Sequence, residues 1–159
     1  MRRELTIGLT LCGLATLVTL CAWALQIPTA NAHCQVPCGI YDDQARMTAM
    51  REDATTISKA IAQINELAGA NNPLGMNQAT RWVMTKEHHA SHIITVVAEY
   101  FLTQKLKPVA KDDPTYNSYL ASLADHHAVM RAAMKTKQTA DPASADALSK
   151  AIDALAKRY

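Results

Sequence analysis

The stretch DQARMTAMREDATTISKAIAQINELA, residues 43–68, determines how this chain folds. Its apolar side chains recur at alternating steps of three and four residues, at Met50, Ala54, Ile57, Ile61, Ile64 and Ala68. That spacing places them along one face of an α-helix and leaves charged side chains on the opposite face. The stretch therefore predicts an amphipathic helix, which must bury its apolar face against other elements.

Three further segments show the same helical period. The second is expected from about Asn77 to Lys105, after a turn rich in Gly, Asn and Pro at 69–75. The third follows Asp-Asp-Pro at 112–114 and the fourth follows Asp-Pro at 141–142, because an N-cap Asp with an early proline is typical of a helix start. The inward faces are expected at Trp82, His89, Ile93, Val96, Tyr100 and Thr103, then at Tyr116, Leu120, Leu123, His127, Met130 and Met134, and finally at Leu148, Ile152, Leu155 and Tyr159.

The whole pattern predicts an all-α protein. A chain of 159 residues suits one domain, and no segment alternates apolar and polar residues as a strand would. Short connections between four amphipathic helices favour an antiparallel four-helix bundle over residues 43–159. The formal net charge of +2 predicts neither a nucleic-acid partner nor a polyanionic one.

The first 32 residues have the order of a signal peptide. Arg2 and Arg3 form a charged head, and the stretch 5–25 that follows has no charge. Ala30-Asn31-Ala32 is an A-x-A cleavage site, so signal peptidase is expected to cut after Ala32 and release a periplasmic or extracellular protein. A retained membrane anchor is the alternative, because an apolar stretch of about 20 residues is long enough to span a bilayer.

Residues 33–42, His-Cys-Gln-Val-Pro-Cys-Gly-Ile-Tyr-Asp, form a candidate metal-binding segment in front of the bundle. Cleavage after Ala32 gives His33 a free α-amine. That amine and the backbone amide nitrogen of Cys34 form one five-membered chelate ring, and the same amide nitrogen and the Cys34 thiolate form a second. The Cys38 thiolate can complete a plane of two nitrogens and two sulfurs, with the His33 imidazole above it. Tetragonal nitrogen and sulfur donors suit Ni(II) or Cu(II) better than Zn(II).

Two other interpretations of this segment stay open. The chain could be an exported, non-enzymatic protein that binds nickel or copper. It could also be a structural helical bundle in which Cys34 and Cys38 form a disulfide, as cysteines in an oxidising compartment often do.

The motif His-Cys-x-x-Pro-Cys-Gly-x-Tyr, here His33 to Tyr41, resembles the nickel hook of nickel-containing superoxide dismutases. The resemblance implies disproportionation of superoxide to dioxygen and hydrogen peroxide through a Ni(II)/Ni(III) cycle, with one nickel ion per subunit. It assigns the metal ligands to His33, Cys34 and Cys38, and it places Tyr41 and Tyr100 near the substrate channel. It also implies a homohexamer of four-helix bundles.

The sequence differs from the family pattern at two positions. The best-known members orient the axial imidazole with a glutamate and an arginine, and the matching positions here hold Thr48 and His89. Glu52, one turn beyond Thr48, is a possible substitute. Because such partners orient ligands and tune their basicity, the departures bear on rate rather than on the metal donors.

The remaining histidines and lysines are expected to have structural or solvent-exposed positions. His88 and His92 share a helix face and could bind a metal, but we expect both to be solvated or hydrogen-bonded and His89 to be buried. In the pair His126-His127, the inward residue is expected to be His127. The lysines at 105, 107 and 111 are expected in a solvated segment; as a hypothesis, they steer the superoxide anion.

Overall fold

The computed structural model describes residues 42–159, so the predicted signal peptide at 1–32 and the hook residues 33–41 lie outside the described part. The helices are α2 (Asp43–Leu67), α3 (Pro73–Thr95), the π-helix η1 (Val96–Lys105), α4 (Tyr116–Lys137) and α5 (Pro142–Ala156). Residues 42–159 contain no strand, which confirms the all-α prediction. Within the same range, no helix is both long and apolar enough to cross a membrane.

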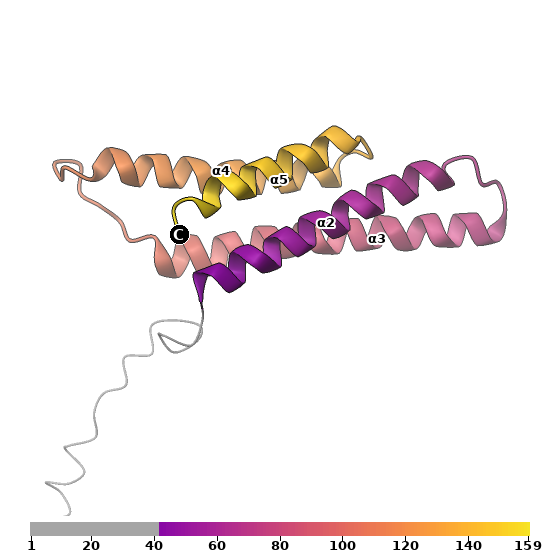
Figure 1. Cartoon of the computed structure of the whole chain (residues 1–159), viewed down its shortest axis with the longest axis horizontal. Helices are drawn as coiled ribbons and strands as arrows, with labels where there is room; N and C mark the ends of the chain where they lie inside the picture. The colour runs from indigo at the N-terminus through magenta and orange to yellow at the C-terminus, as the bar shows by residue number, and fades with distance from the viewer. Residues whose placement is uncertain (1–41) are drawn as a thin grey trace, which may run out of the picture. The chain divides into compact units, whose positions relative to one another are not determined.

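The helices form two antiparallel pairs (Figure 1). One pair is α2 with α3, and the other is α4 with α5. α2 also packs against α5, and α3 against α4, so each helix has two neighbours, as in a four-helix bundle. The core between them is mainly aliphatic and includes Met47, Met50, Ile57, Ile61, Ile93, Leu148, Ile152 and Leu155.

Asx-Pro sequences start two of the helices. The Asp141 side chain accepts a hydrogen bond from the Ala143 N–H and Pro142 is the first residue of α5, as predicted. The Asn72 side chain accepts from the Gly75 N–H in the same way, so α3 begins at Pro73 and not near residue 77. Gly75 is a helical residue at a close approach, because a Cβ there would lie 2.4 Å from the Ala70 Cβ.

The predicted start of the third helix was wrong in detail. The Asp113 carboxylate accepts from the Thr115 N–H at 2.7 Å and from its hydroxyl at 2.6 Å, which makes a turn ahead of the helix. Helix α4 then begins at Tyr116 without a side-chain cap.

The predicted inward face of α4 was also wrong. The buried residues are His126, Val129, Ala133 and Thr136, and the first three each lie one position before an expected residue. Leu120 and Met134 are 43% and 37% exposed, and His127 is exposed as well. Apolar side chains occur on both faces of α4, and Met130, which was expected to face inward, is partly buried and packs against the core.

The second half of the α3 segment is a π-helix, which the sequence pattern did not predict. The Leu106 backbone N–H donates to the carbonyl of Phe101 at 2.8 Å, five residues back, as in a π-helix. The Thr103 hydroxyl and the Gln104 side-chain amide also donate to carbonyls five residues back, those of Ala98 and Glu99. Each turn therefore takes an extra residue. Thr103, expected on the inward face, is exposed, whereas Val96, Val97, Tyr100 and Phe101 are buried.

Candidate active site

The predicted nickel ligands, His33, Cys34 and Cys38, and the predicted channel residue Tyr41 lie outside the described residues. The length of the chain between these residues and α2 still limits how far they can lie from the start of that helix. Cys38 precedes Asp42 by four residues, so their Cα atoms are at most about 15 Å apart. Asp42 caps the first turn of α2, where its carboxylate accepts from the Gln44 N–H at 2.7 Å. The start of α2 is thus the part of the bundle relevant to the hook.

Tyr100 lies at this end of the bundle. Its hydroxyl donates a 2.6 Å hydrogen bond to Oδ1 of Asp43, the first residue of α2. The other carboxylate oxygen of Asp43 pairs with the Lys105 Nζ at 3.1 Å. The guanidinium of Arg46 lies 5.5 Å from the centre of the Tyr100 ring, within range of a cation–π interaction.

These surroundings keep the Tyr100 phenol protonated. Burial and the neighbouring Asp43 carboxylate raise the pKa of Tyr100 to about 12, because both disfavour a tyrosinate anion. The single phenolic proton is committed to Asp43. Tyr100 therefore presents only oxygen lone pairs to any other molecule, and it is a poor proton donor at neutral pH.

Phe101 supports Tyr100 from inside the bundle. It is fully buried and contacts the Tyr100 ring edge-on, with ring centres 4.9 Å apart. Its other face meets Tyr159 at 4.7 Å and His126 at 5.6 Å. The C-terminus, which follows α5, therefore lies at the same end of the bundle as the start of α2 (Figure 1).

His126 is a buried structural histidine. Its Nδ1 donates to the Ser122 carbonyl at 2.7 Å, and its Nε2 accepts from the Tyr159 hydroxyl at 2.9 Å. This arrangement uses the neutral ring. Burial lowers the pKa of His126 for the same reason, since it disfavours the charged form. The expected structural role fits this geometry, although His126 takes the inward position expected for His127.

A second polar cluster joins α2 to α3. Asp53 is nearly buried, and its two carboxylate oxygens accept from Nδ1 of His89 and Nδ1 of His92, each at 2.6 Å. His92 thus pairs with His89 through Asp53, whereas His88 is exposed and only meets the edge of the His89 ring. Sequence reasoning missed Asp53. Its position between Met50 and Ile57 on the apolar face of the helix was the available signal.

The structure also places the residues considered as partners of the axial imidazole. Thr48 and Glu52 are both exposed on α2. The Nδ1 of His89 is engaged by Asp53, which leaves its Nε2 for any further contact. Among the lysines expected in a solvated segment, Lys107 and Lys111 are exposed between η1 and α4, whereas Lys105 is paired with Asp43.

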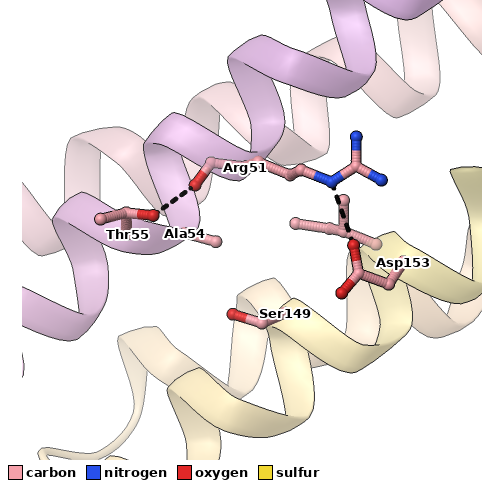
Figure 2. A pocket seen from close by; sticks show the side chains of 6 residues that line it. Arg51, Ala54, Thr55, Ser149 and Asp153 are labelled. Atoms are coloured by element: carbon pink, nitrogen blue, oxygen red, sulfur yellow. Dashed lines mark hydrogen bonds and ion pairs between the residues drawn. The ribbon is translucent and has the colours of Figure 1, made fainter.

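A small hollow between α2 and α5 contains none of the predicted site residues. Figure 2 shows its lining, which includes Arg51 and Ser149, and the Arg51 Nε pairs with Asp153 at 3.0 Å across it. Both side chains of that pair are exposed, so it is a surface ion pair with a small effect on stability. Over the described range 42–159, no three His, Cys, Asp or Glu residues are grouped as metal ligands.

These observations define a class of protein. It is a helical bundle whose first helix is preceded by a short segment rich in metal-donor atoms. The family model for nickel-containing superoxide dismutase matches residues 28–159. The chain belongs to this family: it is an oxidoreductase that acts on superoxide, and its cofactor is nickel. No curated protein and no solved structure matches the chain.

Proposed function

We propose that the mature protein disproportionates superoxide with a nickel ion held by a hook at residues 33–42. The ligands are the α-amine and imidazole of His33, the amide nitrogen and thiolate of Cys34, and the thiolate of Cys38. The observation that carries the proposal is the His-Cys pair directly after an A-x-A cleavage site, in a chain of this family. Only cleavage at that bond lets the His33 amine form a five-membered ring with the Cys34 amide nitrogen, which also belongs to the ring of the Cys34 thiolate.

The donor set fits nickel. The amine and imidazole of His33, the amide nitrogen of Cys34 and the two thiolates are nitrogen and sulfur donors of the kind that would hold nickel. Nickel held this way supplies a one-electron couple between Ni(II) and Ni(III). Two superoxide ions and two protons then give one dioxygen and one hydrogen peroxide, because one superoxide loses the electron that the other gains.

Two tyrosines of the chain are proposed to control how substrate and water reach the metal. Tyr41, one residue before the helix cap, and Tyr100, beside that cap, are proposed to narrow access for substrate and to hold ordered water. The Tyr100 hydroxyl donates its hydrogen bond to Asp43 and stays protonated, so the protons for peroxide are proposed to come from water, Tyr41 or a protonated hook group.

Maturation and location follow from the same cleavage. Signal peptidase would remove residues 1–32 and create the metal-binding amine in one step, which places the active enzyme in the periplasm or outside the cell. A cut one residue away would move the amine and so remove the ring that it forms with the Cys34 amide nitrogen.

The subunits are proposed to assemble as a homohexamer. Three large apolar side chains on α3 support association: Leu74, Met76 and Met84 are 68%, 67% and 66% exposed. A contact between subunits would cover such side chains from solvent. Analytical ultracentrifugation of the mature protein tests this proposal, and a monomer at micromolar concentration would contradict it. Met84→Glu should shift the assembly toward smaller species.

The deciding experiment expresses the whole precursor with nickel and measures three quantities on the purified protein. Mass spectrometry should give a chain that starts at His33, metal analysis should give one nickel per subunit, and pulse radiolysis should show catalysed superoxide decay. Cys34→Ser and Cys38→Ser should each lose the redox-active nickel and the activity. Cys21→Ser is the matched control, because that cysteine leaves with the signal peptide.

Each alternative gives a different result. Nickel bound without superoxide decay would support a non-enzymatic metal-binding protein. A Cys34–Cys38 disulfide without metal would support a structural bundle. A mature chain that starts anywhere except His33 contradicts the hook.

A further inference from the structure

Asp43 is the residue that connects the start of α2 to the π-helix. It is the first residue of α2 and directly follows the capping Asp42. One carboxylate oxygen accepts from the Tyr100 hydroxyl at 2.6 Å, and the other lies 3.1 Å from the Lys105 Nζ. A single side chain therefore holds two groups of η1, at the end of the bundle where the hook is attached.

The π-helix makes this double contact possible. Tyr100 and Lys105 are five residues apart. In an α-helix with 3.6 residues per turn, residues five apart point about 140° away from each other. In η1 each turn takes an additional residue, so the two side chains return to nearly the same face. One carboxylate can then reach both.

The surroundings of the Asp43 carboxylate favour these contacts. A carboxylate in the first turn of a helix is stabilised by the helix dipole, and the Lys105 ammonium adds an opposite charge. A hydrogen bond to an ionised acceptor is shorter and stronger than one between neutral groups. The 2.6 Å separation between the Tyr100 hydroxyl and Asp43 agrees with such a bond.

We propose that Asp43 is a positioning residue for superoxide dismutation, which holds the Tyr100 phenol with its proton turned away from the substrate and keeps Lys105 beside it. This inference rests on the proposed function. Superoxide is an anion that accepts hydrogen bonds, so a phenol whose proton is already donated gives it no binding site. Tyr100 then acts as a neutral wall of the substrate passage, while water and the Lys105 ammonium supply the hydrogen-bond donors.

The proposal predicts how the alkaline limit of activity arises. If Tyr100 loses its proton, a tyrosinate beside the passage repels superoxide. Three charged groups act on this ionisation: Asp43 and Asp42 oppose it, and Arg46 favours it. Removing the Asp43 charge makes the ionisation easier, because it takes away a negative neighbour of the phenolate. The fall of the dismutation rate at high pH should therefore begin at a lower pH when Asp43 is neutral.

The test uses Asp43→Asn in the nickel-loaded enzyme, with two readouts. The first is the ionisation of Tyr100, followed by ultraviolet difference absorbance against the same protein with Tyr100→Phe. Its midpoint should fall by about one pH unit in Asp43→Asn. The second is the pH profile of the dismutation rate, whose alkaline limb should move in the same direction. The double variant Asp43→Asn with Tyr100→Phe should show no such movement of the limb.

Asp153→Asn is the matched control, because it also removes one carboxylate of the bundle but lies on the exposed α2–α5 surface (Figure 2). It should leave the Tyr100 midpoint unchanged. An unchanged Tyr100 midpoint in Asp43→Asn, or an alkaline limb that moves equally without the Tyr100 hydroxyl, overturns the inference. Either result leaves the proposed function intact. A wild-type enzyme that binds nickel without catalysing superoxide decay overturns the proposed function instead, whatever the midpoints are.

Discussion

Replacing the three neighbouring histidines of α3 one at a time tests the polar cluster between α2 and α3. His89 and His92 each donate from Nδ1 to the nearly buried Asp53 carboxylate, whereas His88 is exposed. We expect His89→Ala and His92→Ala to lower the free energy of unfolding, and His88→Ala to leave it almost unchanged. The three positions lie in one helix and carry the same residue, so helix propensity and side-chain size cancel in the comparison.

The magnitude follows from the contacts. A hydrogen bond to a charged group contributes about 1.5–3 kcal/mol. The His89 and His92 side chains are 31% and 47% exposed, so water replaces part of each lost contact. We therefore expect losses of about 1–2 kcal/mol for each of the two substitutions and less than about 0.5 kcal/mol for His88→Ala. Asp53→Ala removes both bonds and should cost about 2–4 kcal/mol.

Urea unfolding followed by circular dichroism measures these differences. With a urea m-value of about 1–3 kcal/mol/M, a loss of 1–2 kcal/mol moves the midpoint by about 0.5–1 M. All variants are compared at one protein concentration, because the apparent stability of an oligomer depends on it. Equal losses for the three histidines would refute the assigned face of α3, and negligible losses at both His89 and His92 would refute a stabilising Asp53 cluster.

Three other predictions concern stability and rate. The folded protein keeps the pKa of His126 below its usual 6.5. The stability that depends on the neutral ring is therefore complete above pH 6.5 and is lost as the pH falls through the lower pKa of the folded state. The urea midpoint should fall with acid less steeply in His126→Gln than in the wild type. Gly75→Ala should destabilise by about 1–3 kcal/mol, since its Cβ would lie 2.4 Å from that of Ala70, and an unchanged melting temperature would contradict the close approach. If exposed lysines steer superoxide, the dismutation rate should fall with ionic strength and fall less in the double variant Lys107→Gln, Lys111→Gln; a rate of the wild type that does not depend on salt would exclude steering.

Helix positions were largely predictable because their signals are local. Asp141-Pro142 starts α5 where expected, and Leu148, Ile152 and Leu155 are buried as expected. The start of α3 at Asn72-Pro73 carries the same type of signal, yet the neighbouring Gly75 was interpreted as part of a turn. That glycine reflects a contact with Ala70, and a contact of this kind is not visible in local composition.

Side-chain partners were less predictable. The apolar pattern of α4 fits two helix faces, and only packing against α3 and α5 selects the one with His126. The π-helix depends on the balance of backbone hydrogen bonds over ten residues, and it changes which of those residues share a face.

By itself, the sequence determined the all-α class and the four helices, and it predicts the leader and the proposed donor set of the hook, because periodicity, capping and chelate-ring size are properties of neighbouring residues in the chain. Only the tertiary structure decided that Asp53 binds His89 and His92, and that Asp43 holds Tyr100 and Lys105. These contacts join residues from different helices, and their three hydrogen bonds connect positions 36 to 57 residues apart in the sequence. Such pairs form only when packing of the apolar faces sets the register between helices.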